Sequence, residues 1–374
     1  MIKRIPLLAF VALWAVVSYL EWRSPLIRAL IEKRPVELTV LGLDETGGAI
    51  RADTILVARF EPATPAIKIL QIPRDISVPS AKGRSKINAV IGRADPGKLN
   101  EELRRLLPEW NLAPQRFLQV NFNAFEEIAG GLGSLPWSGE TLGGEESLDL
   151  VRYRDATGDW GRLNTQKSYL ALVLKILSQE PWRLLGPMVR WKRLKNLVHT
   201  DLWSFELLSL LSRARSLAGA EELFFFQLPT SVNRHGDLSV EPKTAQELVA
   251  WWQGDPLANR TLRRDTTTLE VLNASSQPGL AMKMTRALRE NFTDLDILYF
   301  GTSPTKQNAG FLVLRQASLR LAKETQVKLN KKAGLDLAHW VAPSRTKGVE
   351  FTLLLGEGAE KSPILKTAAS LENF

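Results

Sequence analysis

Hydrophobic and polar positions follow two different spacings along the chain, and each spacing predicts a different element. Short, continuous or alternating apolar runs bounded by turn residues such as Gly47 and Gly48 indicate β-strands. Longer stretches with apolar residues every three or four positions indicate helices, one of which ends at Pro108. Strands are predicted at 38–43, 54–60, 66–72, 117–121 and 223–228, and helices at 26–32, 99–107, 165–178 and 203–217. The mixture predicts an α/β fold in which helices sandwich a mixed sheet.

The pattern is interrupted once, in a polar stretch around Pro256, and then resumes. Strands at 268–272, 295–300 and 351–355 and helices at 280–290 and 316–325 follow. They predict a small C-terminal domain of βαβ type, which we expect to fold on its own. The expected parts are an anchor and juxtamembrane segment at 1–34, an α/β domain at 35–252, a linker at 253–267, the small domain at 268–358 and a tail at 359–374.

The N-terminal segment has the pattern of a transmembrane helix. Lys3 and Arg4 precede an apolar run at 5–20, and Trp22 follows it as an interfacial residue. About 18 residues are near the lower limit for spanning a bilayer. A cleaved signal peptide and a buried core helix are the alternatives, but no small-residue cleavage site follows the run. Because large domains are translocated largely regardless of their charge, we expect a single-pass anchor with the C-terminal bulk extracytoplasmic.

Composition restricts the chemistry. The 374 residues include no cysteine and only three histidines, which excludes disulfides and thiolate chemistry and leaves little for a multi-histidine metal centre. Carboxylates and arginines must therefore carry any reaction. The net charge of +9 suits an acidic substrate, an anionic membrane surface or a nucleic acid, and does not choose among them.

Arginines gather just before the helix predicted at 165–178. If the chain is extended there, Arg152 and Arg154 point to one face of a strand. If a helix begins near Gly161, Arg162 and Gln166 lie one turn apart on its surface. Guanidinium groups suit bidentate contact with phosphate oxygens, so the segment predicts a site for an anion, best a polyphosphate. A solvated, charged surface loop is the alternative.

Acidic and basic residues also mark the ends of the predicted strands. Asp44 ends the first strand, and Arg51 and Asp53 enter the second, where alternation would place both on one face. Arg74 follows the third strand, and Lys86 comes shortly after it. Two neighbouring carboxylates are ligands that Mg²⁺ or Mn²⁺ prefers, usually completed by waters and substrate phosphates. Each residue taken alone is also explained as a turn former, an ion-pair partner or a solvated charge.

Taken in order, these motifs resemble the LytR-CpsA-Psr family of bacterial envelope phosphotransferases. The resemblance covers about 35–228 and rests on LGLD, RADT, IPRD, KIN and RYR, followed by an acid, an arginine and a glutamine. The second domain, with TLEVLNASSQPGLA and LLLGEG, looks like the LytR-type C-terminal domain often appended to this family. One departure is Thr165, where the family usually has an arginine. The resemblance implies an α/β sandwich with a hydrophobic lipid pocket beside the arginines.

The activity that the resemblance implies is Mg-dependent transfer of a glycopolymer from a polyprenyl pyrophosphate carrier to a cell-wall acceptor, peptidoglycan or polysaccharide, with a pyrophosphatase side activity. Asp44 and Asp53 match the family's metal-binding acids. Asp159 matches an acid that orients an arginine or helps to activate the acceptor hydroxyl. We expect catalysis to involve Arg51, Arg74, Asp159 and Arg162, and pyrophosphate to be bound by Arg51, Arg74, Lys86, Arg152, Arg154, Arg162 and Gln166.

The sequence also allows two alternative functions to be compared with an enzyme. A non-catalytic envelope protein that binds polyprenyl phosphate or anionic glycan would need the arginines but not the paired acids, so Asp44 and Asp53 favour an enzyme. Nucleic-acid binding is disfavoured because an exported domain meets no DNA and the arginines lie at strand ends rather than along one helix. The apolar run at 169–177 is too broad for one packing stripe and either fills the core or lines a polyprenyl tunnel. The sequence identifies neither the glycopolymer nor the acceptor.

Overall fold

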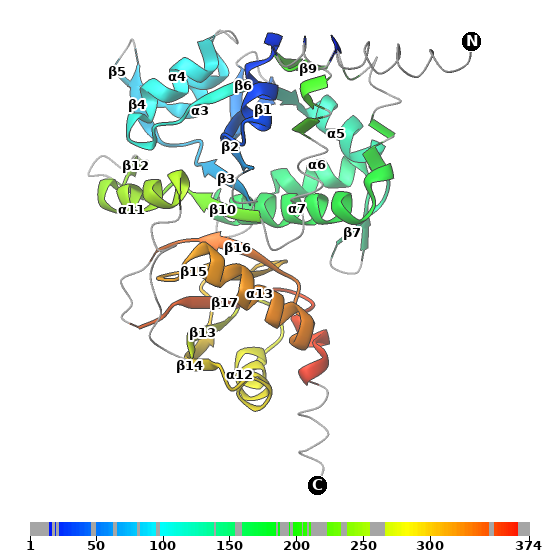
Figure 1. The fold of residues 1–374 in the computed structure, drawn as a ribbon, viewed down its shortest axis with the longest axis vertical. Helices are drawn as coiled ribbons and strands as arrows, with labels where there is room; N and C mark the ends of the chain where they lie inside the picture. The colour runs from blue at the N-terminus through cyan, green and yellow to red at the C-terminus, as the bar shows by residue number, and fades with distance from the viewer. Residues whose placement is uncertain are drawn as a thin grey trace.

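The computed structural model has a mixed α/β architecture built on one large sheet (Figure 1). It describes residues 15–16, 19, 22–45, 50–62, 66–80, 83–94, 98–137, 140–153, 159–184, 186–187, 194, 197–203, 205–207, 209–210, 223–232, 238–254, 266–343 and 348–365. The sheet has eleven strands in the order β14-β13-β17-β15-β16-β10-β3-β2-β1-β6-β9. The mixed-sheet α/β class predicted from the sequence is therefore confirmed.

The N-terminal half of the sheet combines antiparallel and parallel pairs. Strand β1 pairs antiparallel with β2 and parallel with β6, while β3 pairs antiparallel with β2 and parallel with β10; β9 closes this end against β6. These strands are β1 (Val36–Asp44), β2 (Arg51–Glu61), β3 (Ala66–Ile72), β6 (Pro114–Asn121), β9 (Val198–Thr200) and β10 (Leu223–Gln227).

Helices and three short hairpins complete this half. The helices are α2 (Pro25–Ile31), α3 (Ile87–Gly92), α4 (Leu99–Leu106), α5 (Phe122–Gly131), α6 (Gly144–Arg152), α7 (Asp159–Gln179) and α11 (Pro242–Gln253), with 3-10 turns η3 (Pro108–Trp110) and η4 (Pro181–Leu184). The hairpins are β4 (Ser77–Ser80) with β5 (Gly83–Lys86), β7 (Leu135–Trp137) with β8 (Glu140–Leu142), and β11 (Thr230–Val232) with β12 (Leu238–Val240). Part of the predicted helix at 203–217 is helical, and 211–222 lie outside the described residues.

We call the part from β13 onward the C-terminal unit. It contains β13 (Thr267–Asn273), α12 (Leu280–Asn291), β14 (Leu295–Thr302), β15 (Gly310–Leu314), α13 (Leu319–Ala333), β16 (Leu337–Val341), β17 (Phe351–Leu355) and η6 (Ala359–Lys361). Strand β15 pairs parallel with β16 and antiparallel with β17, and β13 lies parallel between β17 and β14. The helix expected at 316–325 begins at Leu319 and continues to Ala333.

The sheet continues without a break from the N-terminal half into the C-terminal unit. Strand β16 pairs parallel with β10, with Phe225 opposite Trp340. The apolar clusters on both faces also contain residues of both parts: Leu70 and Leu312 lie in one, Ile69 and Phe311 in the other. The division at 253–267 stays a prediction, but the shared sheet is a physical reason to expect the two parts to depend on each other.

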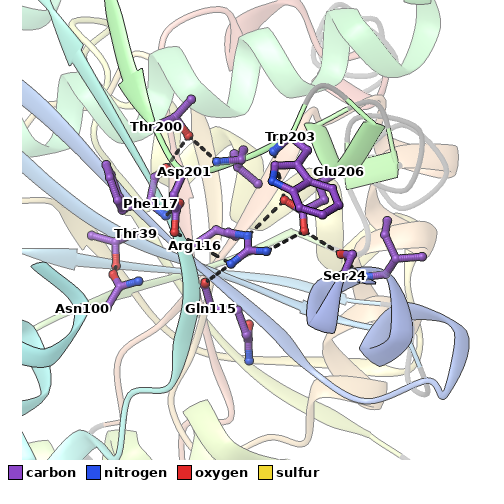
Figure 2. A network of polar contacts seen from close by, with 12 residues as sticks. Ser24, Thr39, Asn100, Gln115, Arg116, Phe117, Thr200, Asp201, Trp203 and Glu206 are labelled. Carbon is purple, nitrogen blue, oxygen red and sulfur yellow. Dashed lines mark hydrogen bonds and ion pairs between the residues drawn. The ribbon is translucent and has the colours of Figure 1, made fainter. Parts of the chain in front are cut away.

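Helix α2 is joined to the sheet by a polar network around the buried Glu206 (Figure 2). The carboxylate of Glu206, which is fully buried, accepts hydrogen bonds from Ser24 Oγ at 2.5 Å and from Arg116 Nε and Nη2 at 3.0 and 2.9 Å. Asp201 lies on the other side of Arg116 at 3.9 Å and accepts a bond from the Phe117 amide at 2.8 Å. We call Ser24, Arg116, Asp201 and Glu206 the Glu206 network.

Most of the predicted anchor at 5–20 lies outside the described residues, so it stays a prediction. Among the residues that the structure does describe, no helix is both long enough and apolar enough to cross a membrane.

Candidate functional site

Four of the predicted site residues meet where β2 begins, at an irregularity in its pairing with β1. Leu43 pairs with Ala52, whereas Gly42 pairs with Thr54, so Asp53 is an additional residue without a partner on β1. Such a β-bulge changes the direction of side chains and is frequent beside active sites. The prediction that Arg51 and Asp53 share a face assumed regular alternation, and the bulge between them removes that basis.

Two arginines converge on the bulge from different elements. Arg74, just after β3, donates from Nη1 to Asp53 Oδ1 at 2.6 Å; its side chain is 12% exposed and that of Asp53 is 21% exposed. Arg162, in the second turn of α7, donates from Nη1 to the backbone oxygen of Asp53 at 2.9 Å. Arg162 is only 3% exposed. Residues more than a hundred positions apart in the chain are thus brought together, as the sequence predicted.

Gln166 lies one turn after Arg162 and ties α7 to the same place. Its Nε2 donates to Thr54 Oγ1 at 3.2 Å and to the backbone oxygen of Val151 at 3.1 Å. The predicted helical spacing of Arg162 and Gln166 is confirmed, because α7 begins at Asp159. We call Asp53, Thr54, Arg74, Arg162 and Gln166 the Asp53 cluster.

Two residues that the sequence analysis did not single out support this cluster. Gln71 is 3% exposed in β3, and its Nε2 lies 3.2 Å from the Leu163 oxygen and 3.4 Å from Gln166 Oε1. Gly42 leaves room for Thr54, since a Cβ there would lie 3.1 Å from Thr54 Cβ. A polar residue within the apolar run at 66–72 was the available signal for Gln71.

The remaining basic residues lie around the cluster with different partners. Arg51 is exposed at the start of β2, opposite Asp44 on β1. Lys86 is exposed and donates to Asp75 Oδ1 at 2.7 Å. Arg152 lies with its guanidinium carbon 4.1 Å from the centre of the Phe122 ring.

For the segment around Arg152, one prediction is wrong and the others are not tested by the described residues. Arg152 is the last residue of α6, so the extended conformation considered for it is wrong. Arg154 lies outside the described residues, and nothing is described of the Asp159 side chain. Their expected roles stay predictions.

Helix α7 carries two apolar stripes rather than one. Leu170 and Leu174 pack toward the sheet, whereas Tyr169 and Ile176 belong to a cluster with Leu135 of β7. This explains why the apolar run at 169–177 is too broad for a single stripe, and it accounts for these side chains by core packing.

Asp44 and Asp53 lie at the same end of the β1–β2 pair, because Asp44 pairs with Arg51. Among the described residues, no group of three or more potential metal-ligating side chains is present. Mg²⁺ is commonly held by one or two carboxylates, with waters and substrate phosphates as its other ligands. The two acids therefore fit a cation shared with a phosphate rather than one held by the protein alone.

Part of this chain is similar to known proteins. Residues 24–136 match the model of the LytR_cpsA_psr family. This segment is similar to a LytR-CpsA-Psr domain. It includes Asp44, Arg51, Asp53, Arg74 and Lys86 and ends before α7.

Curated relatives match between 37% and 40% of the chain. The polyisoprenyl-teichoic acid–peptidoglycan teichoic acid transferase TagU of Oceanobacillus iheyensis is 27% identical over 162 residues, which cover 37% of this chain and 50% of TagU. The corresponding transferase TagV of Bacillus subtilis is 25% identical over 179 residues, covering 40% of this chain and 45% of TagV. The chain thus spans about half the length of the curated relatives it matches. A solved structure of TagT bound to LI-WTA has a TM-score of 0.49 and 18% identity, covering 59% of this chain and 90% of that one.

Proposed function

We propose that this protein is a cell-envelope phosphotransferase that moves a glycopolymer from a polyprenyl pyrophosphate carrier to a cell-wall acceptor. The observation that carries the proposal is the convergence of Arg74, Arg162 and Gln166 on the bulge at Asp53. The names of TagU and TagV describe transfer of teichoic acid to peptidoglycan, which supports a glycopolymer as the transferred group. We also propose that residues 5–20 anchor the protein, with its bulk outside the cytoplasm, and that the C-terminal unit is LytR-like.

In the proposed reaction, the acceptor hydroxyl oxygen attacks the phosphorus atom that carries the glycan. A new phosphorus–oxygen bond forms, and the bond to the bridging oxygen breaks, so that polyprenyl phosphate leaves with the electron pair. The hydroxyl proton passes to a base, for which Asp159 is our candidate. Arg74 and Arg162 neutralise the charge that develops on the phosphate oxygens, as preorganised donors do in phosphoryl transfer.

Asp44 and Asp53 would hold Mg²⁺ or Mn²⁺, which supplies charge neutralisation on one phosphate when it is bound. Arg74 donates a hydrogen bond to the carboxylate of Asp53 and therefore fixes the direction of that side chain. The backbone oxygen of Asp53 accepts a hydrogen bond from Arg162 and so helps to orient its guanidinium group. Gln166 donates a hydrogen bond to the backbone oxygen of Val151 and so links α7 to the end of α6.

The decisive experiment measures transfer with a soluble polyprenyl pyrophosphate–glycan analogue and a peptidoglycan fragment in the presence of Mg²⁺. We expect a phosphodiester-linked product and release of polyprenyl phosphate. Tight binding of the analogue without turnover, at any divalent metal concentration, would instead identify a non-catalytic binding protein.

The metal proposal has its own test. Asp53→Asn should lower turnover about a hundredfold, because an anionic ligand of a hard cation is lost. Circular dichroism checks that the variant keeps its fold. Full activity of the unchanged protein in saturating EDTA would rule out the cation.

A further inference from the structure

One lysine lies inside the apolar stripe that α7 turns toward the sheet. Leu163, Leu170 and Leu174 are apolar positions at helical spacing, and Lys167 lies between them at the same spacing. Lys167 is 2% exposed. A long basic side chain at such a position is unusual, because lysine is almost never fully buried unless it is paired.

The ammonium group of Lys167 is held by the C-terminal unit. Its Nζ lies 3.4 Å from the centre of the Trp340 ring on β16 and 5.6 Å from that of Phe311 on β15. Asn164 Oδ1, one turn earlier on α7, lies 3.4 Å away. Within the part of the chain that the structure describes, no carboxylate forms an ion pair with Lys167. Burial lowers the pKa of Lys167 to about 7.

A cation over an aromatic ring is attracted by the negative face of the π system. This attraction is directional, and it adds to the apolar packing of α7 a preference for the rotation that places Nζ over the Trp340 ring. Burying an ammonium without a carboxylate partner carries a desolvation cost. The arrangement therefore gives up packing stability and gains a fixed rotation of α7.

The fixed rotation matters because adjacent turns of α7 reach the Asp53 cluster. Gln166 is the residue directly before Lys167. Measured from Lys167, Arg162 lies about 7.5 Å earlier along the helix axis, at 1.5 Å per residue. Both side chains make single, well-directed bonds to β2, Gln166 to Thr54 and Arg162 to the Asp53 oxygen. A small rotation of α7 would misalign both bonds at once.

We propose that Lys167 is a positioning residue, through which Trp340 of the C-terminal unit sets the grip of Arg162 and Gln166 on a pyrophosphate group. The pairing of β10 with β16 keeps Trp340 in place relative to the first part of the sheet. The C-terminal unit is then part of the machinery of the site although it contributes no side chain to the substrate. This inference rests on the proposed function in taking pyrophosphate as the ligand.

The test uses the full chain, inorganic pyrophosphate with Mg²⁺ as the probe, and calorimetric titration well below the unfolding temperature. Lys167→Met and Trp340→Leu should each weaken pyrophosphate binding about fivefold, and the double variant should bind no more weakly than either single variant, since both remove one interaction. Trp340→Phe keeps an aromatic face and should bind like the unchanged protein. Lys332→Met is the matched control, because Lys332 also lies over an aromatic ring, Phe292 at 5.3 Å, but away from α7.

The outcomes separate this inference from the proposed function. If Arg162→Lys loses pyrophosphate binding while Lys167→Met and Trp340→Leu retain it, the positioning role is wrong and the proposed site stands. If the unchanged protein does not bind pyrophosphate at all, both are wrong. Should Lys167→Met fail to fold, the contrast between Trp340→Leu and Trp340→Phe decides, since Trp340 is only half-buried.

Discussion

The Glu206 network and the Asp53 cluster both combine acidic side chains with arginine but are arranged differently. In the Glu206 network, a fully buried carboxylate accepts two bonds from one guanidinium group and a third from Ser24. In the Asp53 cluster, two guanidinium groups each make a single bond to Asp53, and the carboxylate is partly exposed. The bidentate pair satisfies its own charge and joins elements together. Separate guanidinium groups around a bulge converge on one place at the end of strands, as binding an anion requires.

The largest effect that this comparison predicts is on Arg162. Arg162→Lys keeps the charge but loses the planar fork, so turnover in the transfer assay should fall about a hundredfold or more. The matched control is Arg105→Lys, whose arginine pairs with Glu102 on the exposed face of α4 and should be neutral. Turnover of Arg162→Lys within threefold of the unchanged protein would remove Arg162 from the site.

Substitution of Glu206 should instead lower the stability of the fold and leave turnover unchanged. Glu206→Ala leaves Arg116 largely buried without its bidentate partner and should lower the free energy of unfolding by about 3 kcal/mol. Turnover per folded molecule should not change. Glu180→Ala is the control, since the pair of Glu180 with Arg183 is partly exposed and should matter by about 0.5 kcal/mol or less. Denaturant titration measures both, and equal effects would contradict the distinction.

Acid should weaken the Glu206 network specifically. Burial acts to raise the pKa of Glu206, but the hydrogen bonds from Arg116 and Ser24 outweigh it and hold the pKa below its ordinary value. The unfolded chain therefore binds a proton before the folded protein does, and stability falls as the pH drops below about 4.5 toward the folded pKa. Unfolding free energies measured between about pH 6 and 3 should fall less steeply for Glu206→Gln. An unchanged slope would assign the acid sensitivity to other carboxylates.

The smallest effect is expected at Lys86. Its side chain is 62% exposed and its partner Asp75 is 25% exposed, so Lys86→Ala should change the unfolding free energy by about 0.5 kcal/mol at most. Pyrophosphate binding should weaken about twofold, and the difference should shrink as salt is added. A loss of tenfold or more would place Lys86 among the residues that bind the anion directly.

The elements that the sequence predicted best are those whose signal is local. Strands β3 and β17 were predicted with the bounds that the structure shows, because each is a short, mainly apolar run close to turn residues. Strands β15 and β16 were missed. In β16 the apolar run is interrupted by His339, which is fully buried and stacks on Phe224 across the strand pair at 4.5 Å. Its burial depends on β10, more than a hundred residues earlier, and no local pattern reveals that pairing.

The same difference between local signals and long-range pairing applies to the residues of the site. Arg74, Arg162 and Gln166 were found because ordered motifs place them at strand ends and on one helix face. The bulge at Asp53 was not, since the register of β2 depends on its partner β1 and not on β2 alone. Lys167 was overlooked for a related reason: a lysine in an amphipathic helix is ordinarily solvated, and only the position of Trp340 shows otherwise.

The bulge has a consequence for how this site changes during evolution. Because Asp53 is an additional residue in a strand that is otherwise regularly paired, deleting that single codon would restore an ordinary β1–β2 hairpin. The chain would keep its sheet and lose both the carboxylate and the backbone oxygen that orients Arg162. A deletion of one residue is thus a further mutational step, besides substitution of Asp53 or Arg162, that would remove the proposed site and leave the fold.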